Sequence, residues 1–195
     1  MILSVAFFLT TALPALQAQP SINMMAKESA VIIRGTSSLH DWEEKVEKFN
    51  VNLDLKFMNT EIADIEKAYF VCSSASITSD YSLMTSKTHD ALNAEKYPRI
   101  IFNMVSVDNF TSSNGKFSGT LTGDLQLAGI TKRISIPFTG HNGNERIVFS
   151  GTKDLNMLDF NIKPPTAMLG TLKTGDKISI DFVLQFQIDR LALKN

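Results

Sequence analysis

The chain has 195 residues with an apolar content of 44%, which suits one globular domain with a sizeable core. Its net charge of −1, with both signs spread along the sequence, provides no basic field for phosphate backbones and so excludes nucleic acid as an expected partner. The single cysteine, Cys72, cannot form an internal disulfide and is expected to be buried.

Residues 1–18 carry no charged side chain and are expected to form a secretory signal peptide. Their apolar run has the length of a signal-peptide core and is short for a membrane span. Pro14 interrupts the run, and Ala18 is a small residue at the expected cleavage site before Gln19. A buried N-terminal helix or an anchor is the alternative interpretation. The mature domain is therefore expected to comprise residues 19–195 and to be periplasmic or secreted.

Alternation of apolar and polar residues predicts antiparallel strands from residue 30 onward. The first strands are expected at 30–34, 49–57 and 68–78. Between the first two lies the turn-rich segment 35–42, which ends on the only tryptophan, Trp42.

The segment 83–97 breaks the alternation and predicts one short helix. Ser86 is expected to cap its start by accepting a backbone N–H bond, because serine is favoured at that position. Ala91 and Leu92 are good helix formers. Pro98 is expected to end the helix, since proline cannot continue it.

Strands resume after Pro98, over 99–107, 117–127 and 132–140. Asn114-Gly115 and Asn142-Gly143 are hairpin-turn dipeptides. Gly119 and Gly123 lie on the apolar face of their strand, where a missing side chain permits sharp bending.

The last strand shows the clearest pattern, with six large apolar residues at alternate positions over 178–188. At roughly 3.4 Å per residue it would extend about 35 Å. The whole pattern predicts an all-β protein, an extended eight-stranded antiparallel barrel with one short helix, because closing the sheet removes exposed edges. A two-sheet sandwich is the alternative.

No catalytic or metal site is expected, and no cofactor. The three histidines, His40, His89 and His141, lack the spacing of metal ligands. Ser37, His40 and Asp41 are the residue types of a hydrolytic triad, but neighbours on one loop cannot face each other as nucleophile, base and orienting group. Capping of the turn is the simpler interpretation.

Two stretches, residues 90–107 and 117–140, resemble the YceI-like family of lipid-binding proteins. The pattern comprises a leucine, an aromatic-Pro pair and an Ile/Phe strand, then alternating Gly and Leu positions and a Gly-Ile-Thr-Lys turn. The matching positions are Leu92, Tyr97, Pro98, Ile101, Phe102, Gly119, Leu121, Leu125, Leu127, Gly129, Ile130, Thr131 and Lys132.

The resemblance implies a lipocalin-like barrel that is exported and holds a polyisoprenoid, an isoprenoid quinone or a similar long-chain lipid, without catalysis. The expected tunnel lining consists of Trp42, Phe57, Leu92, Phe102, Met104, Leu121, Ile136, Phe138, Phe149, Phe182 and Phe186. The expected polar groups of the rim are Arg99, Lys132, Arg133 and His141. The sequence leaves open a ligand-free structural or interaction module whose core is filled by side chains, and it leaves open both a monomer and a homodimer.

Overall fold

The computed structural model describes residues 20–167 and 170–189. Within these ranges the chain forms twelve strands, one α-helix and three short 3-10 helices. In chain order they are β1 (Ser21–Met24), η1 (Ala26–Glu28), β2 (Ala30–Ser37), β3 (Trp42–Val46), β4 (Phe49–Met58), β5 (Glu61–Ser73), η2 (Ser74–Ser76), β6 (Ile77–Thr78), α1 (Ser82–Leu92), β7 (Arg99–Ser113), β8 (Lys116–Leu127), β9 (Ile130–Asn142), β10 (Arg146–Asn156), η3 (Met157–Phe160), β11 (Thr166–Ala167) and β12 (Leu172–Asp189). The expected signal peptide lies outside the described residues.

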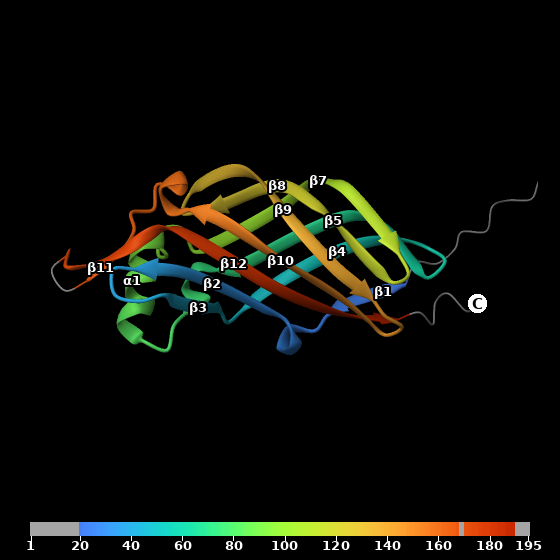
Figure 1. Ribbon diagram of the computed structural model, residues 1–195, viewed down its shortest axis with the longest axis horizontal. Coiled ribbons are helices and arrows are strands. Elements are labelled where there is room, and N and C mark those ends of the chain that lie inside the picture. The colour runs from blue at the N-terminus through green and yellow to red at the C-terminus, as the bar shows by residue number, and fades with distance from the viewer. Residues whose placement is uncertain (1–19, 168–169, 190–195) are drawn as a thin grey trace, which may run out of the picture.

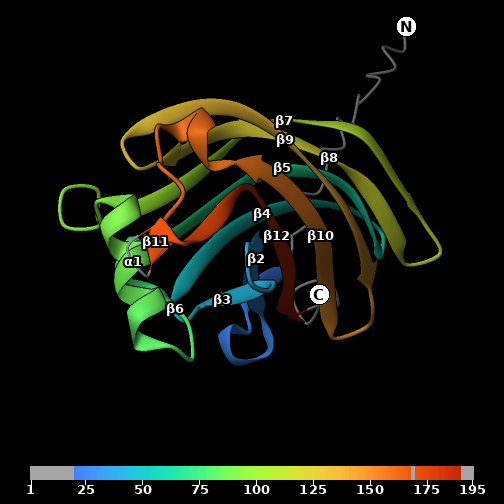
Figure 2. The ribbon, with the colours of Figure 1, turned by 60° about the vertical axis from the view of Figure 1, so that its left-hand side comes forward.

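All twelve strands belong to one antiparallel sheet that curls around an elongated interior (Figures 1 and 2). The main path runs β4-β5-β7-β8-β9-β10-β12-β2-β3-β6, while the short strands β1 and β11 pair with β12. The long C-terminal strand thus lies between β10 and the N-terminal strand β2, so the two ends of the fold stabilise each other.

The expected all-β architecture with one helix is confirmed, and the continuous sheet replaces the alternative of a two-sheet sandwich. The number of strands is larger than the expected eight, because the N-terminal region divides into β1, β2 and β3 and because β6 and β11 are only two residues long. These short strands carry little alternation, so periodicity does not detect them.

The helix lies where the sequence placed it, but its start differs. It begins at Ser82, and Tyr81 at the N-cap makes no side-chain capping bond. Ser86 lies inside the helix, so the prediction that it caps the start is wrong. The helix ends before Pro98, because Asn93 adopts a left-handed conformation with a φ of 49°. No helix in the described part of the chain is long and apolar enough to cross a membrane.

Alternation in β12 produces one inward face with two environments. Phe186 and Ile188 are 2% and 5% exposed, whereas Ile178, Ile180, Phe182 and Leu184 on the same face are only half-buried. The predicted inward face is therefore correct, since Val183 between them is 41% exposed. The difference along the face arises because the interior is filled at one end and hollow at the other.

Figure 1 shows α1 at one end of the curled sheet. Phenylalanine rings fill the interior at the other end. We call Phe117, Phe138, Phe149 and Phe186 the phenylalanine cluster. The Phe117 and Phe149 ring centroids are 4.7 Å apart, and Phe149 meets Phe186 edge to face at 5.9 Å. Tilted and edge contacts of this kind suit the quadrupoles of aromatic rings. The cluster closes this end of the interior.

The cluster generates a stability prediction. Replacing Phe186, which is 2% exposed, with alanine removes a ring from a closed core and should lower the free energy of unfolding by about 3–5 kcal/mol. Replacing the adjacent, exposed Gln187 with alanine should change it by less than about 0.5 kcal/mol. Urea denaturation of both variants measures the difference, and equal effects would show that the assignment of the inward face is incorrect.

Candidate functional site

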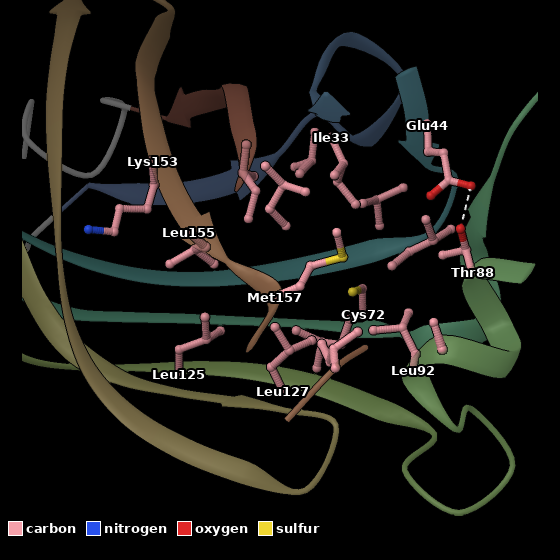
Figure 3. Close-up of a pocket in the computed structure, with 18 of the residues that line it drawn as sticks. Ile33, Glu44, Cys72, Thr88, Leu92, Leu125, Leu127, Lys153, Leu155 and Met157 are labelled. Carbon is pink, nitrogen blue, oxygen red and sulfur yellow. Dashed lines mark hydrogen bonds between the residues drawn. The ribbon is translucent and has the colours of Figure 1, made fainter. Parts of the chain in front are cut away.

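A cavity of about 620 Å³ lies within the curled sheet on the side of α1, and Figure 3 shows part of its wall. Strands from β2 to β12 and the helix contribute its lining, which is almost entirely aliphatic and aromatic. Tyr81 and Leu83, 71% and 63% exposed, belong to this lining, so the cavity reaches the surface beside α1. The opposite end is closed by the phenylalanine cluster. The result is a deep apolar pocket that opens beside α1.

The structure divides the expected lining residues into two groups. Six of them lie on the cavity wall: Trp42, Leu92, Phe102, Leu121, Ile136 and Phe182. Phe57, Phe138, Phe149 and Phe186 lie in the closed core at the other end, and Met104 packs against both regions without lining the cavity. Both groups occupy inward positions, so the alternation of apolar and polar residues identified the inward face of the sheet. It carried no information about where along the strands the interior is hollow.

The expected rim cations lie away from the cavity. Arg99, Lys132, Arg133 and His141 are not among its lining residues. Arg133 Nε donates to Asp124 Oδ1 at 2.6 Å, and this bond lowers the pKa of Asp124 from its usual value. Lys132 Nζ lies 3.2 Å from Asp159 Oδ1. These exposed pairs contribute little to stability.

One acidic group in the wall was missed by the sequence analysis. Glu44 shares the inward face of β3 with Trp42 and Val46, lines the cavity and is only 2% exposed. Thr88 Oγ1 of α1 donates to Glu44 Oε1 at 2.8 Å (Figure 3). Burial raises the pKa of Glu44, while the Thr88 bond and the charge of His89 act in the opposite direction. The alternation of Trp42, Glu44 and Val46 is the signal that could have placed this carboxyl inside.

Two lysines of the lining were missed as well: Lys87 of α1, which is exposed, and Lys153. Lys153 occupies an inward position of β10 between Gly151 and Leu155, and it lines the cavity. In Figure 3 its side chain points away from Glu44. The alternation of Phe149, Gly151, Lys153 and Leu155 could have identified its orientation.

Cys72 is buried in the wall, as expected, at 4% exposure. Burial raises the pKa of its thiol to about 12, which makes the reactive thiolate scarce at neutral pH.

The Ser37–Asp41 loop forms a turn. Ser37 Oγ donates to the backbone carbonyl of His40 at 2.7 Å, and the His40 ring nitrogen Nδ1 lies 2.6 Å from the backbone oxygen of Asp41. These contacts close the loop through backbone atoms. Within the described residues, no group of three or more His, Cys, Asp or Glu side chains is arranged to hold a metal ion.

The chain is similar in sequence to UPF0312 proteins of Pseudomonas species. A UPF0312 protein of Pseudomonas putida (strain W619) is 37% identical over 102 residues, which are 49% of this chain and 50% of the relative. A UPF0312 protein of Pseudomonas savastanoi pv. phaseolicola (strain 1448A / Race 6) is 33% identical over 144 residues, 71% of this chain and 64% of the relative. The chain spans about half the length of the first curated relatives that it matches.

Solved structures share the fold at low sequence identity. Burkholderia cenocepacia BcnA matches with a TM-score of 0.66 and 19% identity, over 84% of this chain and 99% of that one. A polyisoprenoid binding domain from Saccharophagus degradans, implicated in plant cell wall breakdown, matches with a TM-score of 0.65 and 13% identity, over 87% and 99% of the two chains.

The family model for the YceI-like domain matches residues 23–186, which include the helix, the strands from β2 to β10 and all but the last three residues of β12. The residues that line the cavity all lie within this range. The chain belongs to the YceI-like family.

Proposed function

We propose that this protein is an exported carrier that holds a long-chain isoprenoid or another apolar lipid in its cavity and leaves the lipid chemically unchanged. The observation that carries the proposal is the apolar cavity of about 620 Å³. It falls in the range of roughly 300–1,000 Å³ typical of ligand sites. Apolar walls with few polar groups favour burial of a hydrocarbon chain over recognition of a polar molecule.

The relatives support a lipid as the ligand class. The Saccharophagus degradans neighbour with the same fold is described as a polyisoprenoid binding domain. A polyisoprenoid or an isoprenoid quinone has the long, slender tail that a pocket closed at one end and open at the other would accommodate.

Apolar burial supplies sufficient affinity. Removing one methylene from water contributes about 0.8 kcal/mol, so ten buried carbons contribute about 8 kcal/mol before the loss of ligand freedom is subtracted. The inward side chains Ile178, Ile180 and Leu184 are only half-buried, so a bound chain would also cover their exposed surface.

The alternative function is that of a ligand-free module whose core is filled by side chains. It accounts for only one end of the interior. The phenylalanine cluster fills one end as that alternative expects. The hollow beside α1 is the part that a lipid would fill.

Calorimetry with lipids of increasing chain length tests the proposal. For uncharged lipids, affinity should rise with each added isoprene or methylene unit until the cavity is filled, with a negative heat-capacity change and weak dependence on salt. The recovered lipid should be chemically intact. Affinity that is independent of chain length, or hydrolysed lipid, would contradict the carrier function.

A matched pair of variants on β12 locates the site in the same experiment. Phe182→Asp places a carboxylate in the cavity wall and should weaken binding by about tenfold or more, because contact with the chain would desolvate it. Val183→Asp introduces the same carboxylate on the outward face, where Val183 is 41% exposed, and should leave binding nearly unchanged.

Glu44 gives the proposed function a pH dependence. Its pKa is raised from the ordinary value of 4.5 by burial, so the folded protein retains the proton at pH values where the unfolded chain has released it. The stabilisation from this group is therefore fully present below pH 4.5 and is lost as pH rises through the raised pKa.

We expect Glu44→Gln, which cannot ionise, to remove this pH dependence. Its stability relative to the wild type should increase as pH rises above 4.5, as measured by unfolding between pH 4 and pH 8. The exposed Glu43 next to it provides the matched control, and Glu43→Gln should show no such divergence. Parallel pH profiles of Glu44→Gln and the wild type would show that burial does not perturb this carboxyl.

Export is the remaining part of the proposal. It is motivated by the charge-free residues 1–18. The protein isolated from outside the cytoplasm should begin near Gln19 on N-terminal sequencing, and an intact Met1 on that material would reject cleavage.

A further inference from the structure

The wall of the barrel is interrupted between β9 and β10. In the described chain these strands pair only where Thr139–Asn142 meets Ile147–Ser150, although both continue well beyond that point. The pairing stops beside Pro137, and proline has no backbone N–H to extend a ladder. We call the unpaired stretch, between residues 130–138 of β9 and 151–156 of β10, the β9–β10 gap.

A second hollow, of about 350 Å³, lies along this gap. Ile134, Lys153 and Leu155 line both this hollow and the large cavity. Phe160 of η3 also lines the second hollow, and Lys132 lies over its ring at 5.7 Å. Three side chains therefore border both the large cavity and the second hollow, and one of them, Lys153, carries an ammonium group.

Lys153 is the one cationic side chain lining the second hollow that has no carboxylate partner among the described residues. The other cationic side chains of this hollow are each held by a carboxylate: Lys132 by Asp159 at 3.2 Å, Arg133 by Asp124 at 2.6 Å and Lys177 by Asp154 at 2.8 Å. Among the described residues, Lys153 makes no ion pair within 4 Å. Its neighbour Asp154 pairs with Lys177 at 2.8 Å, and the charge of Lys153 makes only the smallest contribution to the lowered pKa of Asp154. Lys153 is also half-buried, with Ile180 directly opposite it on β12.

We propose that the β9–β10 gap is the head-group site for an anionic amphiphile, whose phosphate or carboxylate binds the Lys153 ammonium while its chain occupies the large cavity. This inference rests on the proposed lipid-carrier function and specifies the class of lipid. A charge-assisted hydrogen bond from a partly buried ammonium to an anionic oxygen is stronger than one between neutral groups. The gap lets a charged group remain near water while its chain is buried.

Matched lipid pairs test the proposal on the full-length protein. Farnesyl monophosphate is compared with farnesol, and hexadecanoate with hexadecanol, by titration calorimetry at low salt. The anionic member of each pair should bind about tenfold tighter or more. Lys153→Gln should reduce that ratio to about one, and Lys153→Arg should restore it. Lys116→Gln, at an exposed position near the far hairpin, has the same change in net charge and should keep the ratio.

The outcomes separate this inference from the proposed function. Neutral lipids that bind well with no preference for their anionic partners would overturn the head-group site and leave the carrier function standing. A preference that survives Lys153→Gln would overturn it too. Binding of neither member would overturn both. Competition by inorganic phosphate alone, at the concentration where farnesyl monophosphate saturates, would show a free-anion site without a role for the chain and would also contradict the proposal.

Discussion

The fold depends on one constraint, which is that a long curled sheet with a continuous apolar inward face must have its interior filled. Each inward residue gains stability only when something apolar covers it. At one end the phenylalanine cluster provides that cover, and Ile147 there is completely buried. At the other end the same face borders a cavity of about 620 Å³, where Ile178 and Ile180 remain half-buried. In the proposed carrier, a bound lipid would complete the packing that the side chains leave unfinished.

Glycines opposite aromatic rings control how much of the interior the side chains occupy. Phe117 lies across from Gly140, and Phe138 from Gly119, on the paired strands β8 and β9. Phe182 likewise lies across from Gly151 in the cavity wall. A Cβ at any of these glycines would overlap the facing ring or crowd it closely, so each ring lies against bare backbone. In the wall, this packing keeps the Phe182 ring close to the sheet and leaves volume free in the centre.

Sequence patterns predicted the strands because alternation reports which side of a sheet a residue faces. They identified the inward face of β12 correctly, and they located the helix between β6 and β7. They could not separate Phe182, in the cavity wall, from Phe186, in the closed core, because both occupy equivalent positions in the alternation. Depth along the barrel depends on how side chains from several strands meet. Glu44 and Lys153 were missed for another reason, since charged residues are expected at the surface even where alternation places them inside.

Glu44 and Lys153, which both line the apolar cavity, lie at the same height along the barrel. Register places Glu44 opposite Ile33, Ile33 opposite Ile180, and Ile180 opposite Lys153, across four neighbouring strands. With strands about 4.8 Å apart, the path along the wall is about 14 Å. No ion pair joins the two in the described residues, so neither neutralises the other. Glu44 is accommodated by its raised pKa and by the Thr88 hydrogen bond. Lys153 is accommodated by the β9–β10 gap, and this difference makes the lysine, rather than the acid, the group suited to meet the charged end of a lipid.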